Sequence, residues 1–376
     1  MIPLITILFS IIICSSVSAA NWTVNPGDNI QTVINGASSQ DNITINTGTY
    51  NQNVLVNKNL TIVSNGTVTI NAGGPGNCFR INSGGSGSTI QGFHLTGATT
   101  SGSLTFAGIR LEGASYVKIL QNTMYNNWAG IFMWPDSRYN QIYNNNISNN
   151  YRHGIRITDG SGYNQIYSNI INNNNLDNQP NSGTTRYGGI TYSSAALGYD
   201  TIYFNQIVGN LRNQLYDPDN TLTAINNWWG TNSAPTGVLG ATYSPWLILG
   251  ITANPYSIYN GQTSTITADL NHNYNGVTYS DVSSLGHVKD GIPISFIFTG
   301  SPLGTLSINP ATTLNGFATT IFTANTAGIS RVNATLNSAN VHTTSNAAQT
   351  PCNILINPYA VLTIDKHTDK YDYNVG

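Results

Sequence analysis

Two aspartates and their neighbours have the spacing best suited to catalysis. Asp136 and Asp159 lie 23 residues apart, and His153 and Arg156 lie close to the second of them. Inverting hydrolysis of a glycoside requires two carboxylates about 6.5–9.5 Å apart, and lyase chemistry typically requires several carboxylates around Ca²⁺ together with an Arg or Lys base. The alternative, which we favour, is that both aspartates are solvated turn residues, because proline precedes the first and glycine follows the second.

Three arginines form a second candidate site. Arg80, Arg110 and Arg156 fall on the same outward position of successive predicted strands, with Phe132 interrupting the column. A guanidinium group binds a carboxylate through paired hydrogen bonds, so this column suits a uronate or a sialate. The commoner alternative is that such arginines only keep the surface soluble.

A column of tyrosines is the third candidate. Tyr116, Tyr139, Tyr163 and Tyr199 recur with the same period. Aromatic rings stack on the C–H faces of sugars, while asparagine amides bond to sugar hydroxyls, so the column suits a neutral glycan. The alternative is that the rings stack only on one another and stabilise the fold.

The composition excludes several classes of function. The chain has 376 residues, of which 13 are Lys or Arg and 15 are Asp or Glu, so its net charge is −2. This balance argues against a nucleic-acid partner. Asparagine stands out with 53 copies, and hydrophobic residues make up 40% and recur periodically. A folded chain is therefore expected rather than a disordered one.

Residues 21–248 contain an internal repeat that would position all three sites. Ile119, Ile142, Ile166 and Ile202 each open a similar block, and an extra loop over 173–187 lengthens the last interval. Apolar and polar residues alternate within a block, which predicts short strands. Such a block predicts one coil of a parallel β-helix, in which equivalent side chains lie about 4.8 Å apart.

Two columns of asparagine follow the same period. They are Asn122, Asn145, Asn169 and Asn205, and, five residues later, Asn127, Asn150, Asn174 and Asn210. Stacked amides are expected to form hydrogen-bonded ladders, and asparagine also tolerates the left-handed conformation expected at coil corners. Residues 26–34 predict a short helix that caps the open core, with Asp28 and Gln31 as its capping box, and Trp228 and Trp229 are expected to cover the other end.

The rest of the chain predicts three further segments. Residues 1–20 have the apolar stretch and small residues of a signal peptide. Residues 249–358 predict an Ig-like β-sandwich, because short alternating strands are separated by Asn-Gly turns. Residues 359–376 are typical of the start of a further β repeat, so we expect the chain to be part of a longer product. The predicted sandwich strands are Ser257–Gly261, Ser264–Leu270, Ile292–Phe298, Gly304–Ile308, Ala318–Phe322 and Arg331–Leu336.

Several motifs carry a family resemblance. Pro26-Gly-Asp-Asn-Ile-Gln31, Thr47-Gly-Thr-Tyr50 and Lys58-Asn-Leu-Thr-Ile62 resemble the opening of pectin-lyase-like right-handed β-helices. Asn226-Asn-Trp-Trp-Gly230 and the Asn-rich repeats resemble the NosD-like branch, in a combination similar to adhesin-like surface proteins of methanogenic archaea. Gly291-Ile-Pro-Ile-Ser-Phe296, with Asn315-Gly-Phe-Ala-Thr319, resembles the bacterial Ig-like domains of invasin and intimin. The NosD-like resemblance raises the question of copper, but the few Met, Cys and His residues show no ligand spacing, so no metal or cofactor is expected.

The sequence therefore predicts an all-β protein with a right-handed parallel β-helix, an Ig-like sandwich and a truncated further repeat. We expect an extracellular protein, secreted or attached to the cell surface, that is adhesin-like or structural in the cell envelope. Its expected partner is a surface or envelope polysaccharide or glycoprotein, and the sandwich is expected to be a stalk leading to further repeats. The alternative is a polysaccharide lyase or glycoside hydrolase. Six glycosylation sequons agree with an extracellular location; they begin at Asn21, Asn42, Asn59, Asn65, Asn146 and Asn333.

Overall fold

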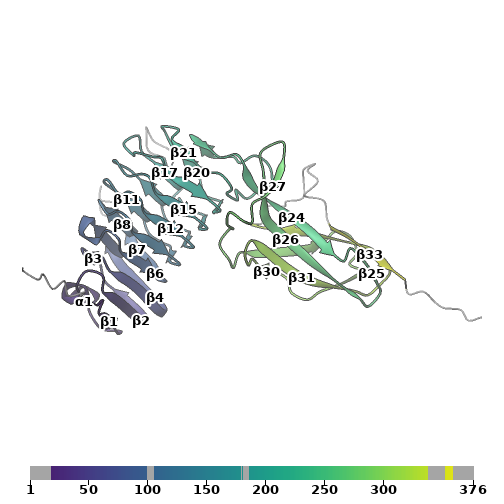
Figure 1. The fold of residues 1–376 in the computed structure, drawn as a ribbon, viewed down its shortest axis with the longest axis horizontal. Coiled ribbons are helices and arrows are strands. Elements are labelled where there is room, and N and C mark those ends of the chain that lie inside the picture. Colours follow the sequence, from purple (N-terminus) through teal and green to yellow (C-terminus); the bar gives the residue numbers. More distant parts are fainter. Residues whose placement is uncertain (1–17, 100–105, 179, 181–185, 338–351, 359–376) are drawn as a thin grey trace, which may run out of the picture. The chain divides into compact units, whose positions relative to one another are not determined.

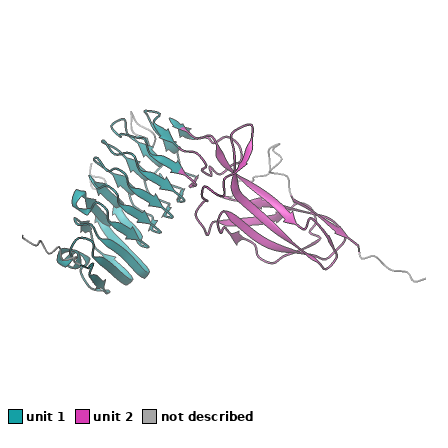
Figure 2. Cartoon of the chain, viewed as in Figure 1, with its two compact units in different colours: residues 1–202, 209–223, 237–241 teal, residues 203–208, 224–236, 242–376 magenta. Residues whose placement is uncertain are grey.

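The computed structural model describes residues 18–99, 106–178, 180, 186–337 and 352–358. Nearly all of the predicted signal peptide, the predicted repeat at 359–376 and part of the predicted loop at 173–187 lie outside these residues. The chain divides into two compact units (Figure 2), one comprising residues 1–202, 209–223 and 237–241 and the other residues 203–208, 224–236 and 242–376. Within the described residues, no helix has both the length and the apolar character needed to cross a membrane.

The first unit is a parallel β-helix with three faces (Figure 1). The first face contains β6 (Thr89–Gln91), β9 (Lys118–Leu120), β12 (Gln141–Tyr143), β15 (Gln165–Tyr167), β18 (Thr201–Tyr203) and β21 (Leu222–Thr223). The second face contains β7 (His94–Thr99), β10 (Thr123–Met124), β13 (Asn146–Ile147) and β16 (Ile170–Asn172). The third face is an eight-stranded sheet in the order β22 (Val238–Leu239), β20 (Asn213–Tyr216), β17 (Gly188–Tyr192), β14 (His153–Ile157), β11 (Ala129–Met133), β8 (Ala107–Glu112), β5 (Phe79–Asn82) and β3 (Val54–Val56).

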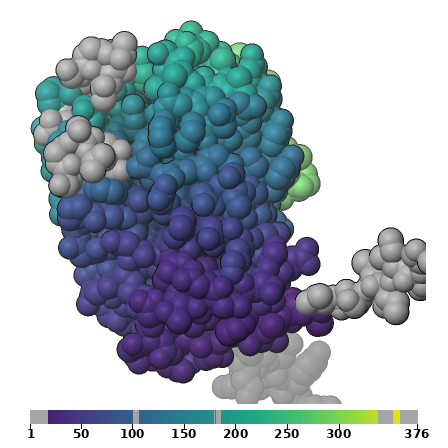
Figure 3. Space-filling model, turned by 90° about the vertical axis from the view of Figure 1, so that its left-hand side faces the viewer, coloured from purple at the N-terminus to yellow at the C-terminus, as the bar shows by residue number. Residues whose placement is uncertain are grey.

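Longer strands form the N-terminal coils. β1 (Asn21–Val24) pairs with β2 (Asn42–Asn51), and β2 pairs with β4 (Thr61–Pro75). β4 is long enough to pair with both β6 and β7, so it joins the first two faces. Figure 3 shows the colours changing gradually from purple to teal along this unit. Successive coils therefore lie next to one another in the order of the sequence.

The core is a set of stacked aliphatic columns. Ile119, Ile142 and Ile166 are in register on the first face, and each is completely buried. On the third face, Ile131 and Ile155 occupy equivalent buried positions in β11 and β14. The alternating pattern of the sequence is therefore confirmed, since apolar residues point inward and their neighbours point outward.

The corners of the two predicted asparagine columns combine a left-handed residue with an inward asparagine. Gln121 and Asn144 have φ values of 57° and 55°, and each directly precedes an asparagine of the first column. The prediction that the column asparagines themselves adopt the left-handed conformation is wrong, because none of them has a positive φ. The preceding residue makes the turn, and this directs the next side chain into the core.

Both predicted asparagine ladders are present. The amide of Asn145 donates to Oδ1 of Asn169 at 3.0 Å and to the carbonyl oxygen of Ile119 at 2.8 Å. The same Oδ1 of Asn169 accepts the backbone N–H of Asn145 at 2.9 Å. In the second column, Asn150 bonds to Asn174 in the same way, at 2.9 Å. Each amide thus satisfies buried backbone groups that the strands leave unpaired at a corner.

A third ladder, at the corner of the tyrosine column, was not predicted. Asn140 donates to Oδ1 of Asn164 at 2.9 Å, and the backbone N–H of Asn164 donates to the carboxylate of Asp200. The hydroxyl of Tyr192 donates to the other oxygen of Asp200 at 2.5 Å. Burial raises the pKa of Asp200 to about 7, which its hydrogen bonds oppose only in part. The ladder therefore ends on a carboxylate that titrates near neutrality.

The predicted capping helix is present, but its cap differs from the prediction. Helix α1 (Ile30–Gly36) buries Ile30 and Ile34 against the first coils. Its N-cap is Asn29, whose side chain accepts the N–H of Thr32, so the predicted capping box of Asp28 and Gln31 is wrong. The carboxylate of Asp28 instead accepts the N–H of Asn25, and the Gln31 side chain bonds to β3.

The second unit is a β-sandwich of two sheets. One sheet has the order β24 (Trp246–Asn254), β26 (Thr263–Tyr274), β31 (Phe317–Ala324) and β29 (Gly304–Leu306), with β27 (Tyr279–Asp281) beside β26. The other has the order β25 (Ser257–Tyr259), β33 (Cys352–Asn357), β32 (Gly328–Thr335), β28 (Pro293–Phe298) and β30 (Ala311–Thr312). All six predicted strand segments contain observed strands. Because β24 begins at Trp246, the predicted boundary after residue 248 falls inside a strand.

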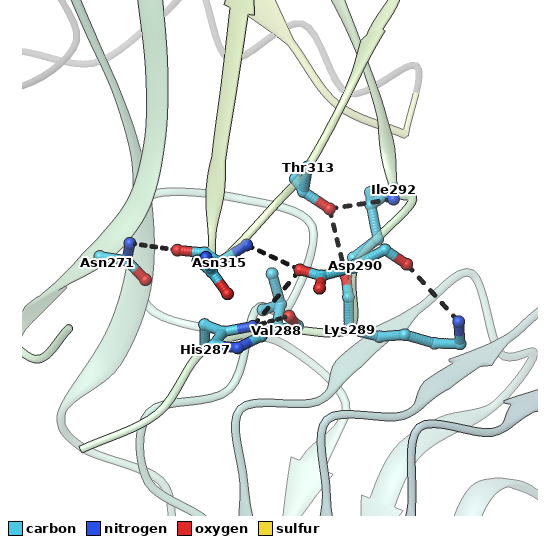
Figure 4. A network of polar contacts seen from close by, with 8 residues as sticks. All are labelled: Asn271, His287, Val288, Lys289, Asp290, Ile292, Thr313 and Asn315. Atoms are coloured by element: carbon cyan, nitrogen blue, oxygen red, sulfur yellow. Dashed lines mark hydrogen bonds and ion pairs between the residues drawn. The ribbon is translucent and has the colours of Figure 1, made fainter. Parts of the chain in front are cut away.

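An Asn-Gly turn of the sandwich is held by a polar network (Figure 4). Asn315 and Gly316 have φ values of 51° and 81°, as a two-residue hairpin turn between Leu314 and Phe317 requires. Asn271 donates to the carbonyl oxygen of Asn315 at 2.8 Å, and the N–H of Asn315 donates to Asp290 at 2.7 Å. The bonds of Asn271 and Asp290 to Asn315 hold this turn in place.

The buried carboxylate of Asp200 gives the first prediction. Between pH 3.8 and about 7 the native state holds a proton that the unfolded chain has released, so the free energy of unfolding falls as the pH rises through this window. We expect urea denaturation to show a loss of the order of a few kcal/mol between pH 5 and pH 8. Asp200→Asn, which continues the ladder with a neutral amide, should remove most of this loss.

Asp219→Asn is the matched control, because this carboxylate is exposed nearby in the chain. It should keep the dependence on pH seen in the wild type. A wild-type protein equally stable at pH 5 and pH 8 would contradict the assignment of Asp200.

Candidate functional site

A pocket of about 390 Å³ opens on the third face of the β-helix. Arg110, Phe132 and Arg156 occupy the same outward register of β8, β11 and β14, so the predicted arginine column is present on this face. The pocket is lined by Arg110, Trp128, Phe132, Trp134, His153, Arg156, Thr158, Asp159 and Tyr187. Three of the four proposed catalytic residues and two of the three column arginines therefore come together.

Arg110 forms one wall of this pocket. Its guanidinium carbon lies 5.0 Å from the ring centre of Phe132 and 5.1 Å from that of Trp134. Glu112 pairs with Arg110 at 2.7 Å and with Arg80 at 2.5 Å. Burial lowers the pKa of Arg110, and the Glu112 carboxylate opposes this change. Arg80 is half exposed and does not line the pocket. Of the three arginines in the column, only Arg110 and Arg156 therefore belong to the pocket.

Arg156 is the least compensated charge of the pocket. Burial lowers its pKa, while Tyr187 and Asp159 act in the opposite direction. Its Nη1 is buried and has no hydrogen-bond partner among the described residues. A buried polar atom without a partner costs free energy, so the Arg156 guanidinium is incompletely satisfied by the described residues.

His153 is completely buried beside Arg156. Its ring lies between two aromatic rings, with centroids 4.9 Å from Trp128 and 5.2 Å from Tyr187. Nδ1 is 2.7 Å from the hydroxyl of Thr191, whereas Nε2 is buried with no partner in the described part of the chain. Burial, together with Arg156 and Arg152, keeps the pKa of His153 well below its usual value, so the imidazole is neutral at pH 7.

The two aspartates lie in adjacent coils but do not meet in the pocket. The backbone N–H of Asp136 donates to the carbonyl oxygen of Asp159 at 2.8 Å. Their φ values are 50° and 45°, as expected for turn residues. Asp159 lines the pocket, whereas the Asp136 carboxylate pairs with Arg138 at 2.6 Å and does not line it.

The tyrosine column is a continuous stack at one corner. Tyr116, Tyr139, Tyr163 and Tyr199 have ring centroids 5.3–5.5 Å apart and planes inclined by 12°. Each has a φ between 57° and 61°, so these tyrosines are the left-handed corner residues of the third ladder. The rings are about half exposed, but the faces of Tyr139 and Tyr163 are covered by their neighbours. Mostly edges remain available to a sugar, which favours a structural role.

The aromatic walls of the pocket were missed in the sequence. Trp128 and Tyr187 each stand two residues before a Gly-Ile pair, and Arg152 occupies the same position in the coil between them. The guanidinium of Arg152 lies 5.3 Å from the ring centre of Tyr187 and pairs with Asp177 at 3.1 Å. A search for aromatic residues at a fixed offset from the Gly-Ile pairs would have found both walls.

Neither the two described cysteines nor any described cluster of metal-ligating side chains adds to this pocket. Cys78 and Cys352 are free, and burial raises the pKa of Cys78 to about 12. Among the residues that the structure describes, no three His, Cys, Asp or Glu side chains gather as a metal site would require.

Comparisons with known proteins agree with this fold. Residues 45–229 match the family model described as "Right handed beta helix region". Pectate lyase Pel9A is similar at 14% identity and a TM-score of 0.44, over 65% of this chain and 76% of that chain. The alginate lyase from Paenibacillus sp. str. FPU-7 is similar at 16% identity and a TM-score of 0.36, over 60% and 70% of the two chains. The D0-D1 domain of intimin is similar at 22% identity and a TM-score of 0.19, over 29% and 48%.

None of the curated proteins compared with this chain matches it. The family match and the parallel three-faced topology together define the first unit as a right-handed parallel β-helix, which confirms the predicted fold.

The tyrosine stack gives the second prediction. Tyr163→Ala removes two ring pairs, each contributing roughly 0.5–1.5 kcal/mol. We expect the free energy of unfolding, measured by urea denaturation, to fall by about 1–3 kcal/mol. Tyr163→Phe keeps the stack and should stay close to the wild type. Equal stability of the alanine variant and the wild type would show that the stack contributes nothing to the fold.

Proposed function

We propose that the β-helix binds a carbohydrate that carries a carboxylate, in the pocket between Arg110 and Arg156, and does not cleave it. The observation that carries the proposal is one pocket with two guanidinium groups and four aromatic side chains. Guanidinium groups recognise carboxylates, and aromatic rings pack on sugar rings. The pocket volume is in the range of about 300–1,000 Å³ of small-ligand sites.

Two partnerless atoms support the same proposal. Nη1 of Arg156 and Nε2 of His153 are buried without a partner among the described residues. A carboxylate seated against Arg156 would accept from the first atom, and the second atom could bond to a ligand oxygen. This arrangement favours the arginines over the tyrosine column as the sugar site, because the tyrosine faces are occupied by one another.

The supply of carboxylates argues against hydrolysis. Hydrolysis of a glycoside requires two carboxyl groups, and Asp159 is the one carboxylate among the described residues that line the pocket. Asp136, the expected second member, pairs with Arg138 outside it. A lyase or hydrolase therefore remains the second candidate, with weaker support than binding.

The same proposal places the protein at the cell surface. An extracellular, adhesin-like or envelope role agrees with the low charge of the chain and with its sequons. In this role the β-helix holds a surface polysaccharide or glycoprotein, and the sandwich is a spacer to further domains.

Arg156→Met tests the proposal. On a glycan array, we expect the wild-type protein to bind uronate- or sialate-containing glycans more strongly at low than at high ionic strength, since salt screens the charge pairs. The variant should lose this binding by about tenfold or more, because a charge-assisted contact is worth about 1.5–3 kcal/mol. Arg138→Met, whose guanidinium lies outside the pocket lining, should bind like the wild type.

Binding of neutral glycans only, or unchanged binding by Arg156→Met, would contradict the proposed site. The cleavage question is answered separately by incubating the protein with pectate and alginate, with and without Ca²⁺. Release of sugar ends that Asp159→Asn abolishes would favour the enzyme instead.

A further inference from the structure

His153 has the features of a proton acceptor inside the pocket. Its two ring nitrogens differ: Nδ1 lies 2.7 Å from the Thr191 hydroxyl, and Nε2 is buried without a partner among the described residues. In a doubly protonated imidazole, Nδ1–H would donate to the Thr191 oxygen and Nε2–H would donate to a ligand. The Thr191 oxygen can therefore accept one of the two protons, and Nε2–H is left to donate to an incoming ligand.

Burial and the charges around His153 explain why its pKa is low in the free protein. Arg156 lies on β14, Arg152 directly precedes that strand, and Arg110 lines the same pocket from β8. Glu112 pairs with Arg110, Asp177 pairs with Arg152, and Asp159 lines the rim. The ring of Tyr187, from the segment before β17, lies beside the imidazole at 5.2 Å and is tilted by 35°.

A bound carboxylate reverses this balance. It would add a negative charge between Arg156 and His153, and a nearby opposite charge favours the protonated imidazole. Because burial excludes water from the ring, the effect of that charge is larger than at an exposed site. Binding of the anion and uptake of a proton would then reinforce each other, since each favours the same state.

We propose that the pocket takes up one proton at His153 when it binds a carboxylate sugar, so that the protein holds acidic glycans more tightly in mildly acidic than in alkaline surroundings. This inference rests on the proposed function and adds its regulation. The proton comes from solvent, moves to the imidazole as the carboxylate enters, and returns to solvent on release.

Calorimetric titration with glucuronate from pH 5 to pH 8 tests the inference. The glucuronate carboxylate stays ionised over this range, so any dependence on pH belongs to the protein. We expect the association constant to fall as the pH rises from the pKa of His153 in the free protein to its higher pKa in the complex, by as much as tenfold per pH unit, the slope of a single proton. The titration is then repeated in two buffers of different ionisation enthalpy. The difference between the two observed binding enthalpies should show uptake of up to one proton for each sugar bound.

Three variants refine the experiment. His153→Gln should bind glucuronate with an affinity that does not change between pH 5 and pH 8. His94→Gln, on β7 and outside the pocket lining, should behave like the wild type. Thr191→Val keeps the imidazole but removes the acceptor of Nδ1–H, so tight binding should be confined to lower pH. If His153→Gln does not fold, wild-type proton uptake and Thr191→Val still decide the question.

The possible failures are distinct. Binding of glucuronate with constant affinity and no proton uptake would overturn the coupling to His153 and leave the proposed function standing. Absence of glucuronate binding at every pH would overturn the proposed function and this inference together. Equally strong binding of the uncharged methyl ester of glucuronic acid would do the same.

Discussion

The β-helix depends on how the polar groups of its corners are satisfied. A coil must turn three times, and each turn interrupts the pairing of strands next to a dry core. At the corners of the asparagine columns a residue with positive φ makes the turn, and the following asparagine points inward and bonds to the next coil, as Asn145 does to Asn169. Unpaired amides at these positions would each cost about 1–3 kcal/mol. This constraint explains why asparagine recurs at these positions in a chain with so few charges.

Because the inner side of each coil is fixed by the ladders, the outer side is free to vary. β8, β11, β14 and β17 present Arg110, Phe132, Arg156 and Thr191 at one register, although the residue before each of them is a buried isoleucine. A substitution at an outward position changes the surface without disturbing the stacking. The pocket therefore consists largely of outward residues and of turn residues such as Asp159, which the coils hold in place.

The sequence was informative where a feature repeats. The strands, the two asparagine ladders and the arginine register follow from spacing alone, because residues one coil apart must be neighbours. It was uninformative where the repeat is broken. The third ladder escaped notice because Val117 precedes its two asparagines and Asp200 ends it. The separation of Asp136 from the pocket could not be foreseen either, since its pairing with Arg138 is a local side-chain contact.

Two buried ionisable clusters in the same unit show how a structural group differs from a binding group. Asp200 is buried, but Tyr192 and Asn164 donate to its two oxygens, so both oxygens have partners within the fold. Arg156 and His153 are also buried, yet each retains an atom without a partner among the described residues, and both of these residues line an open pocket. Removing a charge from water is costly unless it is fully paired, and the β-helix gains no stability from leaving these atoms unpaired. The incomplete pairing of these two atoms therefore supports the proposed ligand site.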